Sequence, residues 1–431
     1  MQDFEQIFKE KEIEYIQFQF TTIFGDLKAV EFPVKIWDTM KNGTGVDGSS
    51  LGFLSTEQSD MKAVPDYSTF AILPWEPRVA RFICDMYDNH GNPHPADPRS
   101  ILKRVINKAE KMGFNYKTRP ELEFYFLDSE GEPFDNGLYM DTGPFDPLAS
   151  LRREITDDMI EMGMGVKTIH HECGNGQHEI EFTTLDALHQ ADNVQTAKLI
   201  AKTRALFNGV ICTFMAKPIL DQAGSGLHIH QYLTKDGENA FSDEKEKISD
   251  TLKFFVGGIL EHVDEITAFL NPTTNSYKRL VPGHEAPVYK SWGVGNRTAL
   301  IRVPGYENKA RIEYRAADAA TNIYLASALL LAAGLDGIEK KIEPIKPTTK
   351  NIENLSDKER EDMEITGLPR TLEEALNYTE KSSFVREILG DLIVDIFIRE
   401  KRKEIKKLNS TNPKNDYDEL TWEYEQYLER V

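Results

Sequence analysis

An alternating run of acidic and apolar residues after Pro120 constrains the fold most: Glu121-Leu122-Glu123-Phe124. This period of two predicts a β-strand, in which side chains two positions apart share one face. Glu121 and Glu123 therefore point to the same side. Two carboxylates fixed side by side repel each other unless a metal ion or a shared proton lies between them, although two solvated surface glutamates would give the same pattern. The rest of the chain decides between these interpretations.

Two further segments place acidic and imidazole side chains on predicted strands. Residues 168–182 predict a hairpin with Gly-Asn-Gly as its turn, and folding the strands about this turn brings Glu172 and Glu179 close enough to bind one ion. His228 and His230 lie two residues apart in another predicted strand, so both imidazoles face one way. Such a pair indicates a metal or phosphate site, or two exposed strand histidines.

Arginine and lysine gather between residues 279 and 315. Arg311, Glu313 and Arg315 alternate, so one predicted strand presents two guanidinium groups on either side of a carboxylate. The basic residues stand among apolar residues and glycines, which weakens their interpretation as solvated surface charge. Guanidinium groups bind phosphate and carboxylate oxygens in pairs, so the segment indicates a polyphosphate and a substrate carboxylate. The basic residues concerned are Arg279, Arg297, Arg302, Lys309, Arg311 and Arg315.

The acidic strands supply a candidate ligand set: Glu121, Glu123, Glu172, Glu179, His228 and Glu313. Five carboxylates and one imidazole are more oxygen-rich than a structural zinc site, and they suit two Mg²⁺ or Mn²⁺ ions. With the basic segment, they predict metal-assisted phosphoryl transfer from a nucleotide. The chain has no Walker Gly-x4-Gly-Lys-Ser/Thr motif and no kinase glycine loop, so metals and arginines would have to hold the phosphates.

Composition argues against several classes of partner. The 71 acidic residues outnumber the 51 lysines and arginines and give a formal charge of -20, which argues against nucleic acid and anionic membranes. No apolar run approaches the roughly 18–20 residues that a membrane span needs, and the first residues are not typical of a signal peptide. Three widely spaced cysteines favour neither a disulfide framework nor a zinc knuckle, so we expect a cytoplasmic protein.

The length of 431 residues predicts two or more domains. Residues 1–98 predict a small strand-rich unit with a glycine-rich loop around Asp47, which is either a site residue or part of a flexible connection. Asp97 or Ser100 can cap the helix that follows the boundary. Apolar periodicity predicts helices over residues 101–112, 147–162, 187–208 and 251–270, a helical region over 371–408, and a docked aromatic tail around Trp422, Tyr424 and Tyr427.

Seven motifs, in one order along nearly the whole chain, resemble those of type I glutamine synthetases. They are Asp-Gly-Ser-Ser from residue 47, Pro-Glu-x-Glu-Phe from 120, His-His-Glu and Gln-His-Glu within 170–179, Gly-Ser-Gly-x-His-x-His from 224, Arg-Leu-Val-Pro-Gly-x-Glu-Ala-Pro from 279, Asn-Arg-Thr-Ala from 296 and Arg-Ile-Glu-x-Arg from 311. The resemblance implies an α+β fold with an N-terminal β-grasp domain, residues 1–98. It also implies a C-terminal glutamine synthetase catalytic domain, residues 99–431, in which an antiparallel sheet funnel is flanked by helices.

The resemblance implies roles for the residues at matching positions. One metal would be bound by Glu123, Glu172 and Glu179, and the other by Glu121, His228 and Glu313. ATP would contact His230, Arg297, Arg302, Lys309 and Arg311, and glutamate would contact Gly224, Arg279, Glu285 and Arg315. Asp47 of a neighbouring subunit would take a proton from ammonium in a pocket with Ser50, Tyr139 and Glu172. Arg297 would stabilise the transferred phosphoryl group, and Glu285 would lie on a flap that excludes water.

We therefore expect ATP-dependent ligation of ammonia to the γ-carboxylate of L-glutamate through γ-glutamyl phosphate, which gives glutamine. The expected partners are glutamate, ammonium and ATP, with two Mg²⁺ or Mn²⁺ ions per site. The resemblance implies a homo-dodecamer of two stacked hexamers with active sites between subunits, and a PII-type protein is a candidate regulator. Two alternatives stay open: a γ-glutamyl ligase that uses a polyamine or monoamine, and a non-catalytic, metabolite-sensing member of the family.

Several residues depart from the pattern of the family, four of them close to site motifs. Lys167 stands where the family usually has a glutamate near the nucleotide ribose, and Ala223 replaces an asparagine before Gly-Ser-Gly. Tyr232 replaces a serine after His-x-His, and His284 replaces a tyrosine in the flap motif. The changes at positions 167, 223 and 284 favour a larger amine as acceptor.

Overall fold

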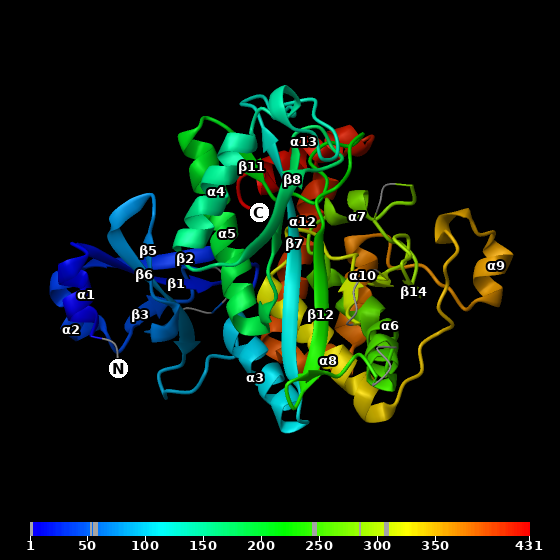
Figure 1. The fold of residues 1–431 in the computed structure, drawn as a ribbon, viewed down its shortest axis with the longest axis horizontal. Helices are drawn as coiled ribbons and strands as arrows, with labels where there is room; N and C mark the ends of the chain where they lie inside the picture. The colour runs from blue at the N-terminus through cyan, green and yellow to red at the C-terminus, as the bar shows by residue number, and fades with distance from the viewer. Residues whose placement is uncertain (1–2, 52–53, 55–58, 244–247, 284–285, 306–309) are drawn as a thin grey trace.

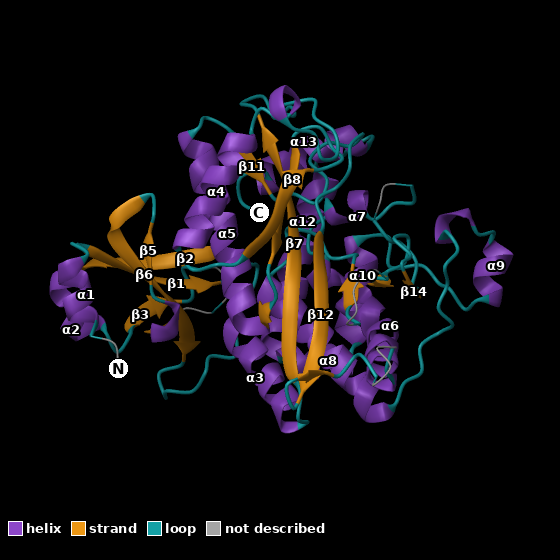
Figure 2. Ribbon diagram, in the orientation of Figure 1, coloured by secondary structure: helices purple, strands orange, loops and turns teal. Residues whose placement is uncertain are grey.

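The computed structural model describes residues 3–51, 54, 59–243, 248–283, 286–305 and 310–431. Within them the chain forms a small sheet near the N-terminus and a larger sheet that is surrounded by helices (Figure 1; Figure 2). This arrangement confirms the predicted α+β class. The chain passes from the last strand of the small sheet, which ends at Tyr87, to a helix that begins at Pro98. The domain boundary after residue 98 stays a prediction.

The N-terminal sheet is six-stranded, with the order β2-β1-β6-β4-β3 and with β5 paired to β6. β1 and β6 run parallel, which places two strands that are distant in sequence at the centre of the sheet. Helices α1 (Phe4–Glu10) and α2 (Trp37–Met40) pack against it through aromatic rings, and Trp37 stacks on Phe82 with ring centroids 5.5 Å apart. The strands are β1 (Tyr15–Thr21), β2 (Leu27–Pro33), β3 (Thr44–Asp47), β4 (Asp60–Pro65), β5 (Ala71–Leu73) and β6 (Glu76–Tyr87).

The larger sheet is ten-stranded and follows the order β14-β15-β16-β12-β7-β9-β8, with β10 and β11 paired to β7 and β13 paired to β12. Its centre is β7 (Asn115–Leu127), the predicted Glu-x-Glu strand extended toward its N-terminus, between β12 (Leu227–Lys235) and β9 (Gln177–Phe182). Its other strands are β8 (Val166–His171), β10 (Leu185–Asp186), β11 (Ile211–Thr213), β13 (Glu238–Asn239), β14 (Trp292–Val294), β15 (Ile301–Val303) and β16 (Ile312–Tyr314).

Long helices surround this sheet. In Figure 1, α4 and α5 lie on one side of β7 and β12, and α6 and α10 lie on the other. No helix in the described part of the chain is long and apolar enough to cross a bilayer. The helices that follow the first sheet include α3 (Pro98–Lys111), α4 (Ala149–Glu161), α5 (Ala187–Phe207), α6 (Asp250–Leu270), α7 (Ser276–Arg279), α8 (Ile323–Lys340), α9 (Asp357–Asp362), α10 (Leu372–Lys381), α11 (Ser383–Leu389), α12 (Asp391–Ser410) and α13 (Asp416–Tyr427).

Most predicted helices are present with small changes at their ends. α3 begins at Pro98, earlier than predicted, because the Asp97 side chain accepts hydrogen bonds from the amides of Arg99 and Ser100. The predicted region 371–408 is divided into α10, α11 and α12. The aromatic tail is helix α13, which docks as predicted. α8 was not predicted, because it is apolar on every side and shows no helical period.

Arg99 at the start of α3 links the N-terminal sheet to the helices of the larger unit. Its guanidinium group donates to both carboxylate oxygens of Asp192 on α5, at 2.9 and 2.8 Å. It also donates to Asp85 on β6 at 2.6 Å and to Asp66 after β4 at 2.9 Å. Arg99 and Asp192 are both buried, whereas Asp85 also pairs with Lys103 at 2.5 Å, so Asp192 depends most on this guanidinium group.

Replacing Arg99 with alanine is expected to lower the free energy of unfolding by about 3–5 kcal/mol, because it leaves the buried Asp192 carboxylate without its ion-pair partner. The thermal unfolding temperature of the purified variant measures this effect. Arg78→Ala is the matched control, because the Arg78–Glu14 ion pair is exposed and such pairs contribute about 0–1 kcal/mol. Equal unfolding temperatures for the two variants would contradict the structural role of Arg99.

Candidate active site

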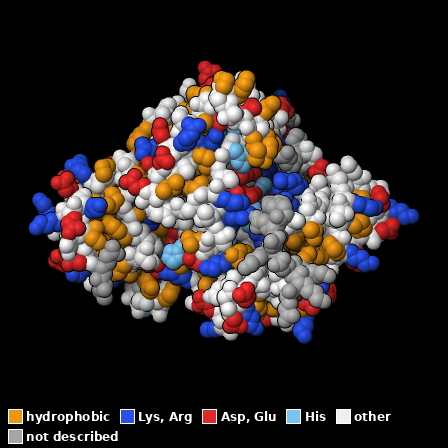
Figure 3. All heavy atoms as spheres, in the orientation of Figure 1, with side chains coloured by type: hydrophobic (Ala, Val, Ile, Leu, Met, Phe, Trp, Pro, Cys, Tyr) orange, Lys and Arg blue, Asp and Glu red, His pale blue; other side chains and the backbone are white. Residues whose placement is uncertain are grey.

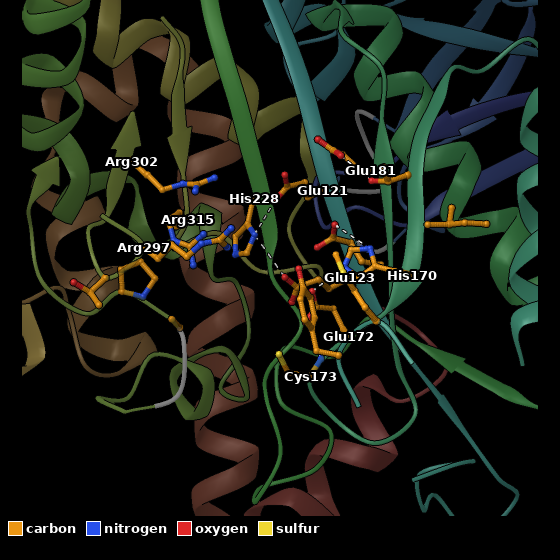
Figure 4. Close-up of a pocket in the computed structure, with 18 of the residues that line it drawn as sticks. Glu121, Glu123, His170, Glu172, Cys173, Glu181, His228, Arg297, Arg302 and Arg315 are labelled. Carbon is orange, nitrogen blue, oxygen red and sulfur yellow. Dashed lines mark hydrogen bonds and ion pairs between the residues drawn. The ribbon is translucent and has the colours of Figure 1, made fainter. Parts of the chain in front are cut away.

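A cavity of about 940 Å³ lies along the larger sheet. In Figure 3, acidic, basic and histidine side chains meet near the centre of the face shown, and Figure 4 shows how they approach one another. Of the residues predicted to act, nine line this cavity: Glu121, Glu123, Tyr139, Glu172, Glu179, His228, Arg297, Arg302 and Arg315. Segments far apart in the sequence therefore contribute to one site.

The register of β7 explains why the carboxylates converge. Glu123 lies opposite Glu179 on β9, and Glu121 lies between Glu181 on β9 and His228 on β12. Residues that lie directly opposite each other on neighbouring strands point to the same face of the sheet. The alternation read from the sequence thus puts the acidic face of β7 against acidic and imidazole side chains on both neighbouring strands.

The hairpin of residues 168–182 adds Glu172 to this face. The amide of Glu172 donates to the carbonyl of Gln177 at 2.8 Å, which closes the turn that was predicted. His170, which was not predicted, lies between the two acidic residues of the hairpin. Its Nε2 is 3.1 Å from Glu172 Oε1, and its Nδ1 is 4.0 Å from Glu179 Oε1. The hairpin therefore places three potential metal ligands together.

Three groups of side chains at the cavity each have ligand atoms within 4.8 Å of one another. They are Glu121 with His230 and Glu313, Glu121 with Glu179 and His228, and His170 with Glu172 and Glu179. Such oxygen-rich sets fit hard divalent ions better than zinc. Glu123 joins the second group through His228, whose Nδ1 lies 3.6 Å from Glu123 Oε1. All six predicted ligands thus lie close to at least one other member of the set.

The two histidines of β12 differ in their partners. Arg311 Nε donates to His230 Nδ1 at 3.2 Å, so a neutral His230 carries its proton on Nε2, which lies 2.7 Å from Glu121 Oε1. His230 is therefore suited to orient Glu121 rather than to bind a metal. His228 Nδ1 lies 3.2 Å from Glu121 Oε2. It remains the better candidate ligand, as the sequence predicted.

The carboxylates of the site differ in the direction in which their pKa values are shifted. Burial raises the pKa of Glu179 well above its usual range, and the nearby Glu121, Glu123 and Glu172 raise it further. Burial acts on Glu121 in the same direction, but hydrogen bonds from His228 and His230 outweigh it and lower the pKa of Glu121 well below normal. Without a cation, burial and repulsion among these groups thus disfavour the charged form of Glu179.

Two arginines hold Glu313 on β16. Arg302 on β15 donates to Glu313 Oε2, and Arg315 donates to Glu313 Oε1 at 2.5 Å. Burial opposes ionisation of Glu313, but Arg315 and His230 outweigh it and lower the pKa to about 2. Arg297 lies at the same end of the cavity, and Figure 4 shows the three arginines on the side of His228 away from Glu181. The site therefore has an acidic half and a cationic half.

Arg279 is buried. It donates from NH1 to the carbonyl of Ala316 at 2.9 Å and from NH2 to the carbonyl of Arg315 at 3.1 Å. A Cβ added to Gly224 would lie 2.6 Å from the Arg279 Cγ, so only glycine fits beside this arginine. Gly224 and Arg279, both predicted to contact glutamate, thus lie side by side in the structure.

Family models match both parts of the chain. Residues 12–89 match the model "Glutamine synthetase, beta-Grasp domain", and residues 95–420 match "Glutamine synthetase, catalytic domain". The chain belongs to the glutamine synthetase family. A relative named "Glutamine synthetase" from Thermotoga maritima is 43% identical over 437 residues, which cover 98% of each chain. Another from Methanosarcina mazei is 45% identical over 410 residues, 92% of each chain.

Solved structures of the same fold match nearly the whole chain. A structure described as "GmaS/ADP complex-Conformation 1" has a TM-score of 0.88 and 32% identity, and the match covers 98% of this chain and 99% of that one. A second, "Apo GmaS without ligand", has a TM-score of 0.88 and 31% identity. The recognition of the family from seven short motifs is therefore confirmed at the level of the complete fold.

Asp47 and Ser50 do not line the cavity of their own chain in this glutamine synthetase family member, although both are described. Asp47 ends β3 in the N-terminal sheet, where it accepts hydrogen bonds from Ser49 Oγ at 2.7 Å and Ser50 Oγ at 2.6 Å. These bonds lower the pKa of Asp47 and keep it ionised. The role assigned to Asp47 therefore requires another subunit and stays a prediction.

Two of the predicted site residues, Glu285 and Lys309, lie outside the described residues, as does the departure His284. Lys167 is described and forms an ion pair with Glu181 at 3.0 Å at the rim of the cavity. Glu181 also accepts from Thr168 Oγ1 at 2.8 Å and pairs with Arg119 at 3.0 Å. Lys167 thus pairs with a carboxylate of this chain rather than adding free positive charge.

The other two departures, Tyr232 and Ala223, are both described. Tyr232 is half-buried, and burial raises its pKa. The carbonyl of Ala223 accepts from Tyr125 Oη at 2.5 Å, so its backbone is held although its side chain is small.

Several residues that line the cavity were not singled out as site residues: Thr168, His170, Cys173, Glu181, Thr298 and Glu353. The motif His-His-Glu contained His170, but nothing in its pattern separated it from a structural histidine.

Proposed function

We propose that this protein is a glutamine synthetase, which ligates ammonia to the γ-carboxylate of L-glutamate with ATP. The observation that carries the proposal is the convergence of the acidic strands with Arg297, Arg302 and Arg315 in one cavity of a glutamine synthetase catalytic domain. The curated relatives at 40–45% identity are named glutamine synthetases, so a larger amine as acceptor is not favoured.

We propose that Glu123, Glu172 and Glu179 bind one divalent ion, and that Glu121, His228 and Glu313 bind the other. Mg²⁺ or Mn²⁺ at these positions would neutralise the phosphate oxygens of ATP. His230 would fix the orientation of Glu121, as its hydrogen bond to that carboxylate indicates. A divalent ion would offset the burial and repulsion that disfavour the charged form of Glu179, because a ligand carboxylate must be ionised.

The arginines would bind the anionic parts of the substrates. Arg297, Arg302 and Arg311 would hold the ATP phosphates and stabilise charge on the transferred phosphoryl group, with Lys309 and His230 contacting the nucleotide. Arg279 and Arg315 would bind glutamate beside Gly224. The γ-carboxylate would attack the γ-phosphorus of ATP, form γ-glutamyl phosphate and release ADP. Glu285 would close the site and keep water from this acyl phosphate.

Asp47 of a neighbouring subunit, with Ser50, would complete the ammonium pocket beside Tyr139 and Glu172. Its carboxylate is held ionised by the serines, so it can accept a proton from ammonium. Ammonia would then attack the acyl carbon and displace phosphate. This arrangement needs an oligomer, and we propose the double-ring dodecamer with a domain boundary after residue 98. A PII-type regulator and a cytoplasmic location are further proposals.

An assay of acceptor choice tests the proposed function. The purified protein is given ATP, L-glutamate and Mg²⁺ or Mn²⁺, with ammonium or with ethanolamine, a monoamine or a polyamine. We expect ADP and glutamine, with kcat/KM for ammonium at least about tenfold above every amine, a difference of about 1.4 kcal/mol in the barrier. Preference for an amine would replace this function with γ-glutamyl amide synthesis. Absence of any metal-dependent ATP turnover in the pure protein would favour a non-catalytic sensor.

A further inference from the structure

The C-terminal helix α13 inserts a fully buried carboxylate, Glu423, into the catalytic unit. Glu423 has an exposed fraction of 0% although it lies on a surface helix with many acidic residues. A buried carboxylate is costly unless several donors satisfy it. Its partners therefore show which part of the molecule depends on it.

Those partners all belong to the short segment that leads into Arg279. Thr274 Oγ1 donates to Glu423 Oε1 at 2.7 Å, and Asn275 Nδ2 donates to Oε2 at 2.8 Å. Lys278 Nζ donates to Oε1 at 2.9 Å and is the residue immediately before Arg279. Lys278 Nζ also donates to Glu419 Oε2 of α13 at 2.6 Å. Glu423 alone bonds to all three residues, and it thus holds the start of α7 and the position from which Arg279 projects.

Asn275 extends this connection to the other side of Arg279. Its Oδ1 accepts from the amide of Lys217 at 2.7 Å, and its Nδ2 donates to the Lys217 carbonyl at 2.9 Å. The preceding carbonyl, that of Ala216, accepts from the amide of Ser225 at 2.8 Å. A Cβ on Gly224 would lie 2.6 Å from the same Ala216 carbonyl oxygen. The walls on both sides of the Arg279 side chain therefore connect to Glu423 through Asn275.

Arg279 has little freedom to compensate if this frame moves. Its guanidinium group already donates to the Ala316 and Arg315 carbonyls, and its stem lies against Gly224. A shift of the 274–278 backbone would therefore move the guanidinium group or break these bonds. A misplacement of about 1 Å in a substrate-binding group can cost about a hundred-fold in rate.

We propose that Glu423 of α13 is a positioning residue for Arg279, so that the C-terminal helix controls how well the site binds glutamate. This inference rests on the proposed function, in which Arg279 binds the substrate carboxylate. Glu423 does not touch substrate, ATP or metal ligands, and it acts through Thr274, Asn275 and Lys278. Loss of its carboxylate should therefore affect glutamate far more than ATP.

The test compares Glu423→Gln and Glu423→Ala with Glu425→Gln, a change of the same kind at an exposed position of the same helix. For Glu423→Ala we expect KM for glutamate to rise by about ten- to a hundred-fold. KM for ATP and kcat at saturating glutamate should change less than about twofold. Glu423→Gln, which keeps one acceptor oxygen for Thr274 and Lys278, should show a smaller rise. Glu425→Gln should match the wild type.

Hydrogen exchange provides a readout that does not depend on activity. Peptides covering residues 273–283 should exchange faster in Glu423→Ala and Glu423→Gln than in Glu425→Gln, while peptides of β7 and β12 stay unchanged. Unchanged exchange and an unchanged KM for glutamate would overturn the inference. If the wild type makes no glutamine, the proposed function fails, and the exchange data alone decide whether Glu423 fixes this segment.

Discussion

Replacing Glu179 with glutamine is expected to lower kcat by at least about a thousand-fold and to leave the metal-free protein as stable as the wild type. The first part follows from the position of Glu179, opposite Glu123 and within reach of both His170 and His228. Loss of one ligand removes charge stabilisation worth several kcal/mol from phosphoryl transfer, and about 4 kcal/mol corresponds to a thousand-fold in rate.

The second part follows from the electrostatics of the metal-free site. Burial and the nearby carboxylates raise the pKa of Glu179 well above normal, so its charged form is disfavoured when no cation is present. Glutamine has nearly the same shape as glutamate and removes the charge that burial and the neighbouring carboxylates disfavour. The substitution should therefore cost metal affinity and activity without a loss of folding stability, a combination that a general structural role would not produce.

Titration with Mn²⁺ followed by thermal unfolding measures both parts. At a free metal concentration a hundred times its Kd, the wild type should gain about 2.7 kcal/mol of stability from each ion, and Glu179→Gln should gain less. Glu130→Gln, at an exposed position after β7, is the matched control. Equal Mn²⁺ stabilisation of Glu179→Gln and the wild type would remove Glu179 from the proposed ligand set.

The acidic half of this site could be predicted because strand periodicity is local information. The alternation of Glu121 and Glu123, and of His228 and His230, fixed which side chains share a face before any pairing was known. The Gly-Asn-Gly turn fixed the return of Glu179 toward Glu172. What the sequence did not contain is the register between distant strands, which places Glu121 opposite His228 and His230 beside Arg311.

Other features depended on tertiary packing and were missed for that reason. α8 is apolar all round because it is buried on every side, so no amphipathic period marks it. The burial of Glu423 also has no signature, because its segment reads as an ordinary acidic helix. The connection from α13 to Arg279 appears only when residues 274–278 and 423 are brought together.

Asp47→Asn is expected to lower ammonium-dependent turnover by about a hundred- to a thousand-fold, because it removes a catalytic base that also binds the ammonium cation. In the structure the Asp47 carboxylate accepts from Ser49 and Ser50, stays ionised, and lies in a different sheet from the cavity. KM for ATP should not change. Asp60→Asn, directly opposite on β4, is the matched control because it removes an exposed charge next to the same strand.

A mixture of two inactive variants then tests whether Asp47 acts on a neighbouring subunit. When Asp47→Asn and Glu179→Gln chains are dissociated, mixed in equal amounts and reassembled, some sites combine an intact Asp47 from one chain with intact metal ligands from the other. In a cyclic oligomer with sites between subunits, about one quarter of all sites should be complete, and activity should return to about that fraction. If each chain used its own Asp47, no mixture could contain a complete site, and the activity would stay at the level of the separate variants.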